Sequence, residues 1–282
     1  YKVGQLAKYG LDYESLRAVN PGLVYCSITG FGQTGPYKDR AGYDFLVQGM
    51  SGIMDLTGEP DGAPQKIGVA FTDIFTGLYG VIAIQAALAQ RERTGQGQHI
   101  DMALLDTLVG VLANQGMNYL ATGESPRRLG NAHPNIAPYQ TFRVADGHFI
   151  LAVGNDGQFA RACAVLDLEA LAADARFATN AARVANRPAL AAAIEEKTLA
   201  WTRDALLRAL EEKGVPAGPI NTVADAFADP QVMARGMRIE PAGIPGLRTP
   251  IVMSDAALSL AARAPRLDEH RQEILQDLAR RG

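Results

Sequence analysis

Residues 73–92 carry the strongest structural signal in the chain, because this segment is apolar on nearly every side. Its pattern predicts a helix that ends at Thr94-Gly95, with Arg91 and Arg93 in the last turn. A helix that is apolar all round is a buried helix, so we expect a folded core around it. The longest apolar stretch, Leu78–Leu88, is shorter than the roughly 20 residues that cross a bilayer, and we expect no membrane partner.

Charge and cysteine content exclude several classes of function. The 27 Lys and Arg nearly balance the 30 Asp and Glu, unlike proteins that bind nucleic acids through their phosphates. Two cysteines without a CxxC pair indicate neither a disulfide framework nor a zinc site, and they favour a cytoplasmic location. The histidines form no i, i+4 pair, so we expect no metal centre. Since the chain begins at Tyr1 without a leader, we expect a fragment or a processed product.

The first part of the chain has the pattern of an α/β domain, and we assign residues 1–121 to part of a large domain. Besides the apolar helix, its segments are a strand at 23–28, a glycine-rich loop at 30–40, a helix over 43–56, a strand at 99–104 and a helix over 105–120. Glycines and prolines then break the pattern between residues 122 and 138, which predicts a linker.

A smaller α/β domain follows at residues 139–228. Its segments are strands at 139–144 and 148–153 around an Asp-Gly turn, and helices over 158–166, 187–197 and 202–212. Residues 229–282 form a return segment whose tail, 268–281, is amphipathic, and we expect it to pack on the large domain.

The glycine-rich loop contains Gly30, Gly32 and Gly35, a literal GxGxxG after a predicted strand. In a dinucleotide-binding fold a helix begins inside this motif, whereas here a polar turn continues to Arg40. The residues leave two stronger hypotheses open, a mobile turn and a ligand loop whose glycines allow close approach of a bulky substrate.

Asp73 is the only charged group between Lys66 and Arg91, and it stands at the start of the apolar helix. Such a carboxylate is either a helix cap or a reactive group. Asp44 supplies a second carboxylate if the glycine-rich loop folds over Asp73. Two further features are weak by themselves: a turn at 154–157 that precedes a helix, and a basic pair, Lys2 and Lys8, that suits a phosphate or plain solvent.

Six segments in order resemble the class III CoA-transferases, the family of formyl-CoA and carnitine CoA-transferases: SITGFGQTGPYKDRAGYD, GVAFTDIFTGLYG, RTGQGQHIDMALLD, NAHPNIAPYQTF, GNDGQF and GVPAGPIN. Within that family, the motifs of this chain are most similar to those of the succinyl-CoA:dicarboxylate branch, which includes the glutarate (hydroxymethylglutarate) CoA-transferases. Agreement of several motifs in order is far more specific than any single motif.

The resemblance implies roles for individual residues. It implies that Asp73 is the catalytic nucleophile, that Asp44 is an acid beside it, and that Tyr43 and Lys8 bind CoA. It also implies that Gly154, Asn155, Asp156 and Gly157 form a mobile loop over the reacting acyl group, although formyl-CoA transferase has a longer glycine run there.

The same resemblance implies the fold and the activity. The fold would be α/β, with a Rossmann-like large domain whose amino-terminal units precede Tyr1, a smaller α/β domain, and two chains interlocked as rings in a homodimer. The reaction would move CoA from an acyl-CoA, such as succinyl-CoA, to a free carboxylic acid through aspartyl anhydride and aspartyl-CoA thioester intermediates, without a metal or other cofactor.

Two alternatives stay open. One is a CoA-ester racemase, although racemases of this superfamily carry a histidine where this chain has Tyr43, and so would lack one acid/base partner here. The other is a non-catalytic CoA-binding subunit, because some CoA contacts would come from the amino-terminal part. The residues do not identify the acceptor acid.

Overall fold

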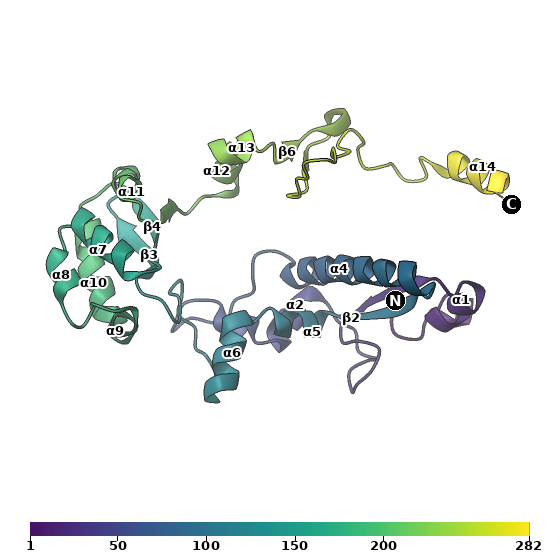
Figure 1. The fold of residues 1–282 in the computed structure, drawn as a ribbon, viewed down its shortest axis with the longest axis horizontal. Helices are drawn as coiled ribbons and strands as arrows, with labels where there is room; N and C mark the ends of the chain where they lie inside the picture. Colours follow the sequence, from purple (N-terminus) through teal and green to yellow (C-terminus); the bar gives the residue numbers. More distant parts are fainter. Residues whose placement is uncertain (282) are drawn as a thin grey trace.

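The computed structural model describes residues 1–281 and has a mixed α/β fold. Figure 1 shows three parts along the chain: an elongated first module up to residue 122, a compact second module over 139–219, and an open arm over 220–281. The first two parts position the residues that the sequence singles out, so the description concentrates on them.

The first module is built on two parallel strands that lie side by side. Strand β1 (Val24–Thr29) pairs with β2 (Gln98–Ala103), with Val24 opposite Gln98 and Thr29 opposite Ala103. Parallel strands need a long crossover, and here it contains the helices α2 (Asp44–Met50), α3 (Ile53–Leu56) and α4 (Phe71–Thr94). Before β1 lie the short helix η1 (Ala7–Tyr9) and α1 (Tyr13–Val19), and after β2 lie α5 (Leu104–Gly110) and α6 (Ala113–Thr122).

Two helices predicted as continuous are each broken in the structure. The segment 43–56 divides into α2 and α3 at Gly52, whose φ of 92° is incompatible with a right-handed helix. The segment 105–120 divides into α5 and α6, where Ala113 has φ 49°. Helical periodicity continues across both breaks, which is why the sequence pattern did not reveal them.

The prediction that the apolar helix is buried is wrong for this chain. On α4 only Thr72, Thr76, Gly80 and Ala87 are buried. These small side chains let the helix lie close to its neighbours β1, β2, α2 and α5. The large apolar residues Ile74, Leu78 and Ile82 lie on another face and are exposed, Ile82 by 63%.

Helix α4 is longer than the apolar stretch Leu78–Leu88 on which the expectation of no membrane partner rests. Over 24 residues, with a mean hydropathy of 1.4 in its most apolar window, it is long and apolar enough to cross a bilayer by length and composition alone. The core helix of a soluble protein has a similar length and composition when it is mostly buried, whereas 22% of this window is buried in the single chain. Its packing against both strands and two helices favours that second interpretation.

The second module contains the larger core. Its sheet has the order β3 (Tyr139–Val144), β4 (Gly147–Ala152), β5 (Ala217–Pro219), and all pairs are antiparallel. The helices around the sheet are α7 (Asp156–Val165), α8 (Glu169–Ala173), α9 (Asn180–Ala185), α10 (Arg187–Thr198) and α11 (Arg203–Glu212). Phe142, Phe149 and Phe159 are buried in one cluster with aliphatic residues of these helices. The buried cluster of the first module is smaller and centres on Val47, Leu104 and Leu108.

The arm consists of short elements: α12 (Val223–Ala228), α13 (Pro230–Ala234), β6 (Arg238–Ile239), η2 (Pro241–Gly243), β7 (Gly246–Leu247) and α14 (Arg271–Arg281). Figure 1 shows it running back above α4, with α14 at its far end. Every residue of α14 is exposed. The expected packing of residues 229–282 on the large domain is therefore not formed by the described part of this single chain.

Candidate functional site

The first turn of α4 is capped by a residue from another helix. Asp44 begins α2, and its Oδ1 accepts hydrogen bonds from the backbone N–H of Thr72, at 2.8 Å, and of Asp73, at 3.4 Å. Helix α4 has no side-chain cap of its own, since Ala70 occupies the N-cap position. Asp44 thus satisfies amides that a helix start leaves without partners.

A buried glutamine holds Asp44 in this position. Gln48 lies one turn along α2 and is fully buried. Its Nε2 donates to Asp44 Oδ2 at 2.7 Å, and its Oε1 accepts from the backbone N–H of Ile67 at 2.9 Å. Because both ends of this amide are engaged, the orientation of the Asp44 carboxylate is determined by the fold.

The carboxylate of Asp73 is left free by this arrangement. It lies in the first turn of α4, and no group in residues 1–281 donates a hydrogen bond to it. Partial desolvation raises the pKa of Asp73, and the nearby negative charge of Asp44 raises that pKa further. Of the two hypotheses for Asp73, the capping role belongs to Asp44, and Asp73 has the free oxygen atoms that a nucleophile requires.

The glycine-rich loop brings Asp44 to this place. Gly30 follows β1, and Gly42 stands two residues before Asp44; a Cβ atom on Gly30 would lie 2.6 Å from the Gly42 Cα atom. The two backbones therefore touch and close the base of the loop. No helix starts between the end of β1 and Asp44, so the dinucleotide interpretation of the GxGxxG motif fails, as its polar context predicted.

The predicted CoA-binding residues lie apart in this chain. Tyr43 precedes Asp44 and is 76% exposed. Lys8 is exposed, with its ammonium 4.8 Å from the centre of the Tyr9 ring. The segment that follows Lys8 is held near the start of β1, where Tyr25 Oη donates to Leu11 O at 2.9 Å. The start of β1 lies beside the carboxyl end of α4, because Arg91 donates to Gly22 O, so Lys8 lies toward the other end of α4 from Asp73.

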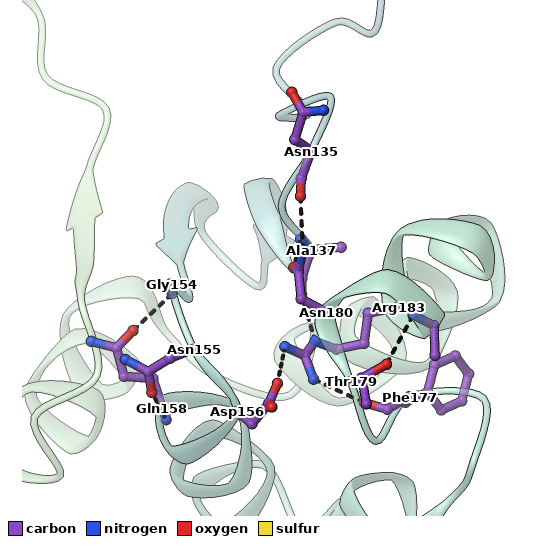
Figure 2. Close-up of polar contacts among 11 residues, drawn as sticks. Asn135, Ala137, Gly154, Asn155, Asp156, Gln158, Phe177, Thr179, Asn180 and Arg183 are labelled. Carbon is purple, nitrogen blue, oxygen red and sulfur yellow. Dashed lines mark hydrogen bonds and ion pairs between the residues drawn. The ribbon is translucent and has the colours of Figure 1, made fainter. Parts of the chain in front are cut away.

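The turn at residues 154–157 belongs to the second module and is not brought to Asp73 within this chain. It is also shorter than predicted, because Asp156 and Gly157 are already part of α7. Asn155 caps that helix by accepting from the Gln158 N–H at 2.9 Å, and Gly154 N–H donates to Gln158 Oε1 at 2.7 Å. Figure 2 shows these contacts beside the pairing of Asp156 with Arg183.

Other features of the described residues do not form a second centre. A cavity of about 510 Å³ beside β1 contains Ser27 and His99, whose Oγ and Nε2 atoms are 2.8 Å apart. No carboxylate within residues 1–281 bonds to His99, so a Ser-His-Asp triad is not formed there. Within the same range no group of three potential metal ligands gathers. Both cysteines are free, and burial raises the pKa of Cys163 to about 11.

A family model described as CoA-transferase family III matches residues 1–271. The chain belongs to this family.

The relatives of this chain belong to the succinyl-CoA:dicarboxylate branch that the motifs indicated. The CoA-transferase chain is 59% identical to the succinate–glutarate CoA-transferase of Agrobacterium fabrum, over 99% of this chain and 71% of that protein. It is 40% identical to the human succinyl-CoA:glutarate CoA-transferase, over 99% of this chain and 65% of that protein. A crystal structure of a CAIB/BAIF family protein from Brucella suis is 69% identical, with a TM-score of 0.86, over 99% of this chain and 74% of that one. The chain thus spans about two thirds to three quarters of these proteins.

Two polar residues of this CoA-transferase chain escaped the sequence analysis. Gln48 carries a recognisable signal, because it stands four residues after Asp44 on a predicted helix and the two side chains therefore share a face. Arg183 carries none, since Ala137 and Asp156, two of its three partners, lie in segments distant along the chain.

Proposed function

We propose that the protein containing this chain is a cytoplasmic enzyme that transfers CoA from succinyl-CoA to a dicarboxylate. Identity of 59% with a succinate–glutarate CoA-transferase supports the donor and the class of acceptor, with glutarate as the first acid to test. The free cysteines Cys26 and Cys163 agree with a reducing location.

One observation carries the mechanism: Asp44 caps α4, and so the Asp73 carboxylate is available for attack. In the first step an oxygen of Asp73 attacks the thioester carbonyl of succinyl-CoA. The carbon–sulfur bond breaks, CoA leaves as the thiolate, and Asp73 becomes a mixed anhydride with succinate.

The thiolate then attacks the Asp73 carbonyl, which forms an aspartyl-CoA thioester and releases succinate. The acceptor carboxylate attacks this thioester, so that a second anhydride forms and the thiolate leaves again. Attack of the thiolate on the acceptor carbonyl gives the new acyl-CoA and returns the Asp73 carboxylate. Each step exchanges one activated carboxyl derivative for another, and the sequence calls for no metal or other cofactor.

The other residues singled out in the sequence would bind CoA or shield the reacting group from water. Tyr43 and Lys8 would contact CoA at separate places, which suits a long ligand. The turn at 154–157 would cover the anhydride and keep water away, because hydrolysis of the anhydride wastes the thioester.

For the assembly, we propose the interlocked homodimer with a Rossmann-like large domain. The exposed apolar face of α4 and the open arm of Figure 1 support an arrangement in which further chain covers both. An assembly of this kind would also bring the second module of one chain toward Asp73 of the other.

The direct test uses an acceptor labelled with heavy oxygen in its carboxylates. The whole protein is incubated with succinyl-CoA and labelled glutarate, and the peptide that contains Asp73 is weighed by mass spectrometry. Because Asp73 keeps one oxygen atom of the acceptor in each turnover, the proposal predicts label in this residue and formation of glutaryl-CoA. Hydroxymethylglutarate, malate and citramalate are compared as acceptors in the same assay.

The outcomes separate the alternatives. A racemase would exchange the α-proton of a CoA ester for deuterium without moving CoA between acids. A binding subunit would retain CoA esters with neither label nor product. Either result would refute the proposed transfer.

A further inference from the structure

The strongest unexplained feature of the second module is a buried arginine. Arg183, on α9, has a side chain only 1% exposed. Its Nε donates to Ala137 O at 2.7 Å, its Nη1 to Phe177 O at 2.9 Å, and its Nη2 to Asp156 Oδ1 at 2.7 Å. A buried guanidinium is tolerated only when it is paired and hydrogen-bonded in this way.

These partners come from three separate parts of the chain, as Figure 2 shows. Ala137 belongs to the linker between the modules, Phe177 to the loop before α9, and Asp156 to the first turn of α7. The guanidinium carbon also lies 4.5 Å from the centre of the Phe159 ring, one turn along α7. The side chain therefore connects the linker directly to the helix that the 154–157 turn enters.

Two neighbouring side chains reinforce the linker end of this connection. Asn180 accepts from the Ala137 N–H at 3.2 Å and donates to Asn135 O at 2.8 Å. Arg187 donates to His133 O at 2.6 Å and to Pro134 O at 3.0 Å. A linker of this composition would otherwise have freedom to move, but five of its main-chain groups are held by α9 and the start of α10.

We propose that Arg183 is a positioning residue for the transfer reaction, because it ties the Gly154–Gly157 turn to the linker that joins the two modules. This inference rests on the proposed function, in which the turn covers the reacting acyl group. Arg183 itself touches no reacting atom. It acts through Asp156, and its effect is to keep the turn where it excludes water from the anhydride.

The test compares two aspartates in the whole protein. Asp156→Ala removes the exposed end of the pair, since this carboxylate side chain is 61% exposed, and leaves no hole in the core. Asp174→Ala is the matched control, because Asp174 pairs with Arg176 in the same module, also at 2.7 Å, but has no contact with the turn. Arg183→Gln removes the other partner. Thermal melting of both variants is followed to separate unfolding from local loosening, because Asp156→Ala leaves the buried guanidinium without its carboxylate.

Two measurements decide the result. Hydrogen exchange of the amides at 154–158 should become faster in Asp156→Ala and Arg183→Gln, and stay unchanged in Asp174→Ala. The ratio of succinyl-CoA hydrolysis to CoA transfer should rise about tenfold in Asp156→Ala, with the fall in kcat larger than any rise in KM.

Faster exchange with an unchanged ratio would overturn the positioning role, and unchanged exchange would overturn the connection itself. If the unmodified protein transfers no CoA, the proposed function fails, and the role of Arg183 in positioning the turn for that reaction fails with it. The exchange data would in that case still decide whether Arg183 holds the turn.

Discussion

At the scale of single residues, two aspartates 29 positions apart in the sequence lie at the amino end of α4, and only one of them caps the helix. Asp44 accepts the amide hydrogens of the first turn of α4, held by Gln48. Asp73 stands on that turn with its carboxylate unoccupied, beside the negative charge of Asp44. The pair therefore places one hydrogen-bonded carboxylate and one free carboxylate at the same helix end.

Asp73→Asn should abolish CoA transfer with little effect on folding. The raised pKa means that the folded chain holds the Asp73 proton more tightly than the unfolded chain. Its stabilising contribution is therefore present at low pH and lost as the pH rises through the folded pKa. At neutral pH the partly desolvated negative charge of Asp73 lowers the stability of the folded chain. This cost offsets the favourable interaction of the same charge with the dipole of α4. We expect the free energy of unfolding to change by less than about 1 kcal/mol, measured by urea denaturation. Transfer at the unmodified rate would contradict the role of Asp73.

The acid side of the pH profile should report the same pair. In the proposed reaction Asp73 attacks as the anion, so kcat/KM should fall as the pH drops through the raised pKa of Asp73. Asp44→Asn removes the neighbouring charge and should move this fall to lower pH, although desolvation remains. In the unmodified protein Gln48 Nε2 donates to Asp44 Oδ2 at 2.7 Å. In Asp44→Asn a side-chain amide nitrogen takes the place of that acceptor, so two donors face each other. We expect the variant to be less stable by about 1–3 kcal/mol. An acid limb that stays in place would show that Asp44 does not influence the nucleophile.

At the scale of elements, the glycine-rich loop determines where α2 begins. Gly30 and Gly42 meet at its base, and α2 starts two residues later with Asp44. A side chain at either glycine would force the loop open, because it would collide with main-chain atoms that cannot move aside.

Gly42→Ala should therefore displace Asp44 and lower the transfer rate, and we expect a loss of about a hundredfold for a shift near 1 Å. Gly110→Ala is the control, since Gly110 ends α5 with open space around its Cα and an ordinary φ. Steady-state kinetics of both variants in the whole protein measure the difference. Equal activity would mean that the close contact of Gly30 and Gly42 does not set the site.

At the scale of the whole molecule, the first module has a smaller core than the second and exposes the apolar face of α4. A group of exposed large apolar side chains on one helix face is the kind of surface that binds another chain. The proposed assembly covers this face, with the arm and the second module as the other parts that reach across it.

Leu78→Lys tests whether another chain covers the apolar face of α4. A lysine in a covered apolar interface loses its hydration without gaining a partner, so the variant of the whole protein should dissociate or lose soluble yield. Gln96→Lys, an exposed position just after α4 and off its apolar face, is the control and should behave as the unmodified protein. Size-exclusion chromatography with light scattering compares them, and a Leu78→Lys protein of unchanged mass and melting temperature would show that the face is free.

Much of the molecule follows from patterns that are local in the sequence. The strands β1 and β2, the hairpin of β3 and β4, and the helices α4, α7, α10 and α11 match predictions to within about two residues at most ends. Turn residues and hydrophobic periodicity act over a few neighbouring positions. The elements that they determine can therefore be predicted from the sequence alone. The ordered motifs indicated the family, which the match over residues 1–271 confirms.

The tertiary structure decided which polar groups meet. The bond from Thr72 to Asp44 spans 28 positions, and the bond from Arg183 to Ala137 spans 46. No periodicity links such residues, because their approach depends on how a loop closes and how a linker runs. The same reason explains α4: its composition predicted burial, but the chain covers only the face with small residues. Hydrophobicity determines that a surface must be covered, and only the spatial arrangement determines what covers it.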